Sequence, residues 1–195
     1  MPAQGGIQHA VLIISGSEQF TAIARACLPA GRFGSIEVRT GAASGRRCLL
    51  ERDFDLVLIH APLQDENGIG LALDIAENRH TSIMLSVPAE VYDDVLEQVT
   101  TQGILAISRP SSRGRIQNAI RFLLSVQDKM TLLRKEADAA REKAEEIRQV
   151  DRAKFTLMEQ RHMSEDEAHR FIGRLAMNSG ISRRRAAAQI LDEYE

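Results

Sequence analysis

The chain has 195 residues, of which 44% are apolar and 27% are charged, so it carries enough apolar material for a buried core. The formal net charge of −2 argues against indiscriminate coating of nucleic acid or membranes, and any nucleic-acid contact must come from local clusters of Arg and Lys. The sequence shows no signal peptide and no run of about 18 apolar residues, and it therefore predicts a cytoplasmic protein without membrane contact.

The first 124 residues alternate short apolar, β-rich runs with helical stretches. This order is typical of parallel strands joined by crossover helices. It predicts an α/β domain over residues 1–124 with a flavodoxin-like, five-stranded, parallel, doubly wound sheet. The expected strands are residues 10–14, 35–38, 56–60, 83–87 and 104–107.

Ligand chemistry in such a sheet takes place at the carboxyl ends of the strands. The candidate pocket residues at these ends are Ser15, Gly16, His60, Ser86 and Arg109. Arg109 is expected to donate a hydrogen bond to a strand-end carbonyl or to Asp65. Asp65 and Glu66, which follow the third strand, are expected to be solvated turn residues.

The residues around the third and fifth strands follow a known spacing: residues 55–59 lead into His60, Pro62 and Gly68 come after it, and Arg109-Pro110 follows the fifth strand. Over residues 7–124 this pattern resembles a response-regulator receiver domain. The resemblance implies Mg²⁺ on an acidic pair after the first strand, a phosphoryl-accepting Asp at the end of the third, and Thr or Ser and Lys after the next two.

This chain has Ser15-Gly16 and His60 where the resemblance calls for acids. Mg²⁺ needs carboxylate oxygens, which an imidazole and a hydroxyl cannot supply. The sequence therefore predicts a pseudo-receiver without aspartyl phosphorylation, metal or other cofactor. Phosphorylation of His60 itself is the alternative, but no acid or metal site is visible to assist it. The favoured interpretation is that His60 fills the space of the lost carboxylate and hydrogen-bonds locally.

Residues 125–149 carry the strongest periodic signal in the chain. Apolar residues repeat every seven positions in two parallel series, and charged residues occupy the positions between them, which is the pattern of a coiled coil. The alternative is a single helix that folds back on its own receiver. A homodimer is favoured, with parallel and antiparallel arrangements both open. The predicted dimer seam is Leu123, Val126, Met130, Leu133, Ala137, Ala140, Ala144 and Ile147.

Residues 150–195 predict a small domain of three short helices, because apolar residues recur at spacings of three and four, among them Phe155, Met158, Phe171 and Leu175. Ser164 followed by Glu167 is a capping box that begins the second of these helices. Ser182 begins the third in a similar way.

Short motifs in this segment follow a fixed order: Ala153-Lys154, Leu157-Met158, Ser164 to Ala168, and Arg174 with Ala176-Met177. They resemble the ANTAR domain of bacterial transcription antiterminators. The resemblance implies binding of paired stem-loops in leader RNA, which prevents a terminator hairpin from forming. A pseudo-receiver, coiled coil and ANTAR domain in series resemble regulators of the AmiR/NasT type, and this implies control by a ligand-sensing regulatory protein.

Cationic side chains in this segment are the candidates for RNA contact, because affinity for nucleic acid comes mainly from cations on phosphate. Three of them lie in the first turn of the last helix, where they oppose the helix dipole and where a bound phosphate would relieve the conflict. The plainer interpretation is a solvated charged face. The predicted RNA-binding residues are Lys154, Arg161, Arg170, Arg174, Arg183, Arg184 and Arg185.

Two other functions compete with RNA binding. Ala176, Gly180, Ser182 and Ala186 have the offsets of a helix-turn-helix, which would make the protein a DNA-binding transcriptional regulator. Alternatively, the coiled coil and pseudo-receiver form an interaction adaptor. An enzyme is not expected, because the sequence has no nucleophile-base pair, metal cluster or phosphate-binding loop.

Overall fold

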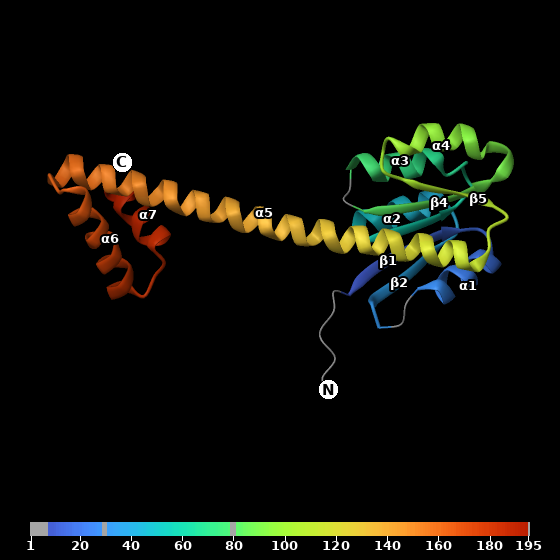
Figure 1. Ribbon diagram of the computed structural model, residues 1–195, viewed down its shortest axis with the longest axis horizontal. Helices are drawn as coiled ribbons and strands as arrows, with labels where there is room; N and C mark the ends of the chain where they lie inside the picture. Colours follow the sequence, from blue (N-terminus) through green and yellow to red (C-terminus); the bar gives the residue numbers. More distant parts are fainter. Residues whose placement is uncertain (1–7, 29–30, 79–80, 195) are drawn as a thin grey trace. The chain divides into compact units, whose positions relative to one another are not determined.

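The computed structural model describes residues 8–28, 31–78 and 81–194. The chain divides into two compact units, Met1–Thr131 and Leu132–Glu195 (Figure 1). Strands and helices alternate in the first unit, whereas the described part of the second is helical. Helix α5, Arg113–Arg161, supplies residues to both units.

The first unit contains a parallel five-stranded sheet with the order β2-β1-β3-β4-β5. All five predicted strands are confirmed, and their observed ends differ from the predicted ones by two residues at most. The predicted α/β fold class is therefore correct. The strands are β1 His9–Ser15, β2 Phe33–Arg39, β3 Leu56–His60, β4 Ser82–Pro88 and β5 Leu105–Arg109.

Both faces of the sheet are covered by helices, as the side-chain alternation along β1 requires. Val11 and Ile13 pack with α1 and the first part of α5, whereas Leu12 and Ile14 point to the opposite core, where α2, α3 and α4 pack (Figure 1). Two-sided burial explains why the central strands are almost continuously apolar. The helices of this unit are α1 Glu18–Cys27, α2 Ala42–Glu51, α3 Ile69–Asn78, the short η1 Ala89–Val91 and α4 Tyr92–Thr100.

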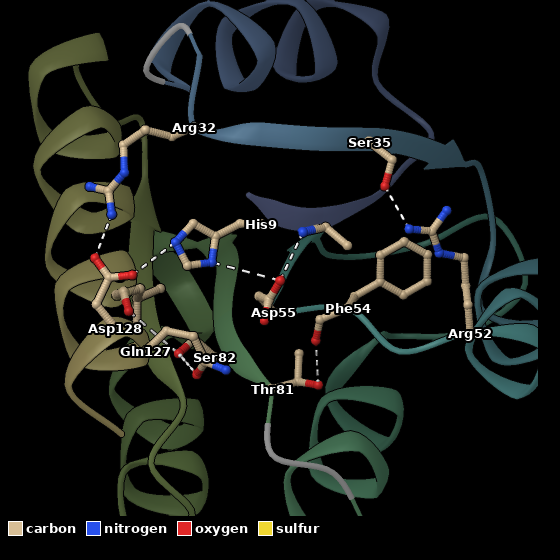
Figure 2. Close-up of polar contacts among 12 residues, drawn as sticks. His9, Arg32, Ser35, Arg52, Phe54, Asp55, Thr81, Ser82, Gln127 and Asp128 are labelled. Carbon is tan, nitrogen blue, oxygen red and sulfur yellow. Dashed lines mark hydrogen bonds and ion pairs between the residues drawn. The ribbon is translucent and has the colours of Figure 1, made fainter. Parts of the chain in front are cut away.

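A polar network ties α5 to the amino-terminal ends of the strands (Figure 2). His9, only 1% exposed, lies between two carboxylates: its Nε2 is 3.0 Å from Oδ1 of Asp128, and its Nδ1 is 3.7 Å from Oδ2 of Asp55. Neither approach has the alignment of a hydrogen bond. Arg32 also pairs with Asp128, and next to it Ser82 Oγ is 3.1 Å from Oε1 of Gln127. These contacts hold α5 against the sheet.

Asp128→Ala should destabilise the first unit by about 1–3 kcal/mol, because it removes a partner of Arg32 and leaves the buried His9 ring with a poorer polar environment. Urea unfolding followed by circular dichroism measures the change. Asp138→Ala is the matched control, because Asp138 is exposed further along the same helix. Equal effects of the two substitutions would contradict a role for this network in stability.

Helix α5 carries the predicted coiled-coil segment, and the structure corrects the seam at its start. Leu123 is 5% exposed and packs in the core of the first unit, so it is not available to a partner helix. The neighbouring Phe122 is 59% exposed instead. The remaining large apolar residues of the predicted seam are exposed: Val126, Met130, Leu133 and Ile147.

The second unit consists of the end of α5, α6 Glu165–Ser179 and α7 Arg183–Tyr194. The first of the three expected short helices is not separate, because residues 125–160 contain no Gly or Pro that would end α5 earlier. The capping box of Ser164 and Glu167 is confirmed, and Gly180, in a left-handed conformation, ends α6. Small residues form much of the core, which comprises Ala153, Leu157, Ala168, Ile172, Ala176, Ala186, Ala187 and Ile190.

Candidate functional site: a degenerate pocket and a cationic helical surface

Three of the five predicted pocket residues line one cavity at the carboxyl ends of the strands. His60 on β3 pairs in register with Ser86 on β4, and Arg109 ends β5. With residues of α1 and the start of α5, they surround a volume of about 510 Å³. Ser15 and Gly16 do not line it. Ser15 is 3% exposed, and its hydroxyl instead accepts a hydrogen bond from the amide of Ser17.

Arg109 and His60 form the polar floor of this cavity. One guanidinium nitrogen of Arg109, Nη1, donates to Nε2 of His60 over 2.6 Å, and Nη2 donates to the carbonyl of Ala61. Of the two hydrogen-bond partners expected for Arg109, the strand-end carbonyl is therefore the one observed. Burial, together with the charge of Arg109, lowers the pKa of His60 to about 4. The imidazole is thus neutral near pH 7 and serves as an acceptor.

Because the folded-state pKa of His60 lies below its ordinary value of 6.5, the unfolded chain binds this proton more readily. The corresponding stability is present above about pH 6.5 and is lost as the pH falls toward 4. The free energy of unfolding of the unmodified protein should therefore decrease between about pH 7.5 and about pH 5. In His60→Asn this decrease should be smaller by about 1–2 kcal/mol.

Urea titrations at the two pH values test this expectation. His169→Asn is the control, since His169 is exposed on α6. An acid-induced loss that is as large in His60→Asn as in the unmodified protein would show that His60 does not cause it.

Asp65 is exposed and Glu66 is partly buried in the bend after β3, and both also form contacts that the sequence did not predict. The carboxylate of Asp65 accepts hydrogen bonds from the amides of Ala42 and Ala43 at 2.7 and 2.9 Å, so it caps the start of α2. These backbone hydrogen bonds lower the pKa of Asp65. The residue before this helix is Gly41, which has no side chain to cap it. Glu66 pairs with Arg46 at 2.7 Å.

In the second unit, three of the seven predicted RNA-binding cations are engaged by the protein itself. Nζ of Lys154 lies 2.9 Å from both Asp151 and Glu165, and these hydrogen bonds raise its pKa. Arg184 donates to Gln149 and pairs with Glu145. The third, Arg161, binds the hydroxyl of Tyr194 and pairs with Glu193 on α7, and it also stacks over the ring of Phe171 on α6.

The other four cations are exposed, and within the described chain their side chains form no hydrogen bond or ion pair. Arg170 and Arg174 are one helical turn apart on α6 and share a face. Arg183 and Arg185 lie in the first turn of α7, where Ser182 caps the helix by accepting from the amide of Arg185. These four side chains could reach phosphate without breaking a hydrogen bond or ion pair within the described chain.

Two large apolar side chains of this unit are exposed, although the sequence does not indicate it. Phe155 is 62% exposed and Met177 is 75% exposed. The helical spacing assigned Phe155 to the buried face, but the structure buries Ala153 and Leu157 there instead. Only the position of the neighbouring helices shows that Phe155 faces outward.

In the part of the chain that the structure describes, no cluster of three or more His, Cys, Asp or Glu side chains is suited to a metal ion. Likewise, none of its helices combines the length and the apolar character that a membrane crossing requires.

Residues 138–191 match the family model of the ANTAR domain, a range that ends in α7 and begins inside the predicted coiled coil. The transcriptional regulatory protein PdtaR of Mycobacterium tuberculosis (strain ATCC 25618 / H37Rv) is 29% identical over 139 residues, which cover 71% of this chain and 67% of that protein. The range that matches the family model lies in the unit that carries the exposed arginines.

Solved receiver domains share the fold of the first unit. The signal receiver domain of an HD domain-containing protein from Pseudomonas fluorescens Pf-5 has a TM-score of 0.56 and 19% identity, covering 67% of this chain and 96% of that one. A CheY-like receiver domain protein from Methanospirillum hungatei JF-1 has a TM-score of 0.55 and 18% identity, covering 63% of this chain and 98% of that one. This chain therefore combines a unit that has the fold of solved receiver domains with a segment, residues 138–191, that matches the family model of the ANTAR domain.

Proposed function

We propose that the protein is a cytoplasmic transcription antitermination regulator that binds paired stem-loops in leader RNA as a dimer. The observation that carries this proposal is the ANTAR match over residues 138–191, in the unit that presents four exposed and unpaired arginines. The similarity to PdtaR, which is named a transcriptional regulatory protein, supports a role in transcription. No catalytic step is part of the proposal.

RNA loops suit this helical unit better than duplex does. Loop bases are unstacked and expose their edges, whereas the deep major groove of A-form RNA is closed to side chains. The exposed guanidinium groups of Arg170 and Arg174 can bind phosphate oxygens. Phe155, an exposed aromatic ring, offers a surface on which an unstacked base could lie.

The proposed dimer joins through the exposed apolar stripe of α5. The stripe starts at Phe122 instead of Leu123 and continues through Val126, Met130 and Leu133 to Ile147. An isolated helix gains nothing from exposing this stripe to water, whereas a second copy of the chain would bury it. A dimer presents two ANTAR domains, so binding of the second stem-loop becomes intramolecular after the first contact.

Control by a protein partner or a ligand, and not by aspartyl phosphorylation, completes the proposal. His60 occupies the end of β3, and Ser15 the end of β1, so the carboxylates that would hold Mg²⁺ and a phosphoryl group are replaced. Incubation with acetyl phosphate and Mg²⁺ should leave the intact mass of the protein unchanged. An added phosphoryl group, detected by mass spectrometry and mapped to one residue, would contradict this part of the proposal.

The function itself is tested by measuring the affinity of the purified chain for leader RNA from its own locus and for duplex DNA across a salt titration. We expect tight binding to RNA with a linear decrease of log K against log salt, and much weaker binding to the duplex. Preference for duplex DNA would favour the helix-turn-helix alternative. Binding to neither at moderate salt would favour an interaction adaptor.

A further inference from the structure

We propose that the cavity at the carboxyl ends of the strands binds a small organic monocarboxylate with an apolar body. The cavity, about 510 Å³ in volume, combines a polar floor with apolar sides. The floor is formed by His60 and Arg109, which end β3 and β5, and by Ser86 of β4, which pairs in register with His60. The sides include Phe20 and Ile23 of α1, as well as Ile116 of α5.

One buried hydrogen-bond donor on this floor has no acceptor in the described protein. Nε of Arg109 lacks a partner, although both terminal nitrogens of the same guanidinium are engaged. Ser86, which is only 1% exposed, lines the cavity beside His60. A buried donor that is left unpaired is costly, and a carboxylate oxygen can accept a hydrogen bond from it.

The charges around the cavity favour a single negative charge on the ligand. Because the pKa of His60 is lowered, its ring is neutral, and Arg109 is the cation of the floor. Glu90, exposed at the rim, would disfavour a more highly charged anion. A group with one negative charge that pairs with Arg109 is therefore preferred to a dianionic phosphate.

The apolar sides favour an organic ligand over a bare inorganic anion. The ring of Phe20 lies 4.5 Å from that of His60, so the wall of α1 continues directly from the polar floor. An apolar body would cover the exposed parts of Ile23 and the wall near Ile116. Because Ile116 lies in the first turns of α5, the ligand would contact the helix that continues into the ANTAR match.

This inference names the class of ligand for the regulation proposed above, and in that respect it rests on the proposed function. Binding of a ligand in the cavity can nevertheless be measured without RNA. Isothermal calorimetry with the full chain and benzoate as the probe should show saturable binding. Arg109→Gln and Ile23→Trp should each weaken it by about tenfold or more. Arg25→Gln, which removes an exposed charge from α1 outside the cavity, should leave it unchanged.

Ile23→Trp keeps Arg109 and its hydrogen bonds, so it remains informative if Arg109→Gln unfolds. Benzamide, the neutral counterpart of benzoate, should bind much more weakly. The inference is overturned if benzoate shows no saturable binding at concentrations up to about 20 mM, or if benzamide binds with the same affinity as benzoate. It is also overturned if inorganic phosphate binds more tightly than benzoate and keeps its affinity in Ile23→Trp. If the chain binds benzoate but does not bind RNA, the proposed function is contradicted and the inference about the cavity is not.

Discussion

Leu133→Asp is expected to weaken the proposed dimer by about a hundredfold or more, and with it the affinity for RNA that carries both stem-loops. Leu133 is 45% exposed at a seam position of α5, and many of the seam residues that follow it are alanines, which bury little area. A charge at this position would have to be buried without a partner when two seams meet. Sedimentation and RNA binding measure the two effects.

Leu132→Asp is a closely matched control. Leu132 is 49% exposed, neighbours Leu133 in the same helix, and lies one position away from the seam. The substitution Leu132→Asp should therefore leave the dimer and the RNA affinity nearly unchanged. If Leu133→Asp remains as dimeric as Leu132→Asp, the α5 stripe is not the dimer interface.

Combined replacement of Arg170 and Arg174 by Ala should weaken RNA binding by about tenfold or more. It should also reduce the slope of log K against log salt by about 1.4, because each lost phosphate contact to single-stranded RNA reduces this slope by about 0.7. The two guanidinium groups share one exposed face of α6 and form no hydrogen bond or ion pair in the described chain, although the charge of Arg170 acts on Glu167. The protein should keep its stability, since neither side chain holds the fold together.

The control is the combined replacement of Arg115 and Arg121 by Ala, which removes the same charge from exposed positions of the receiver-type unit. A similar loss in both double variants would mean that total charge, and not this face of α6, controls affinity. Lys154→Ala is less informative, because it also breaks the ion pairs with Asp151 and Glu165.

Short-range patterns in the sequence determined the fold class and the start of α6. The strands are recognisable because parallel strands that are buried on both faces need continuous apolar runs, as in residues 56–59. The capping box of Ser164 and Glu167 is recognisable because both partners lie within one turn. The ANTAR motifs were identified for the same reason, since their spacing lies within single helices.

Only the tertiary structure decided which side chains have partners and which face water. Asp65 caps a helix that begins 23 residues earlier in the chain, a relation that no local pattern encodes. Leu123 enters the core while Phe122 faces outward, because the packing of α5 on the sheet sets the rotation of the helix. Lys154 and Arg161 form ion pairs with acidic side chains that lie further along the chain, whereas Arg174 forms none in the described chain.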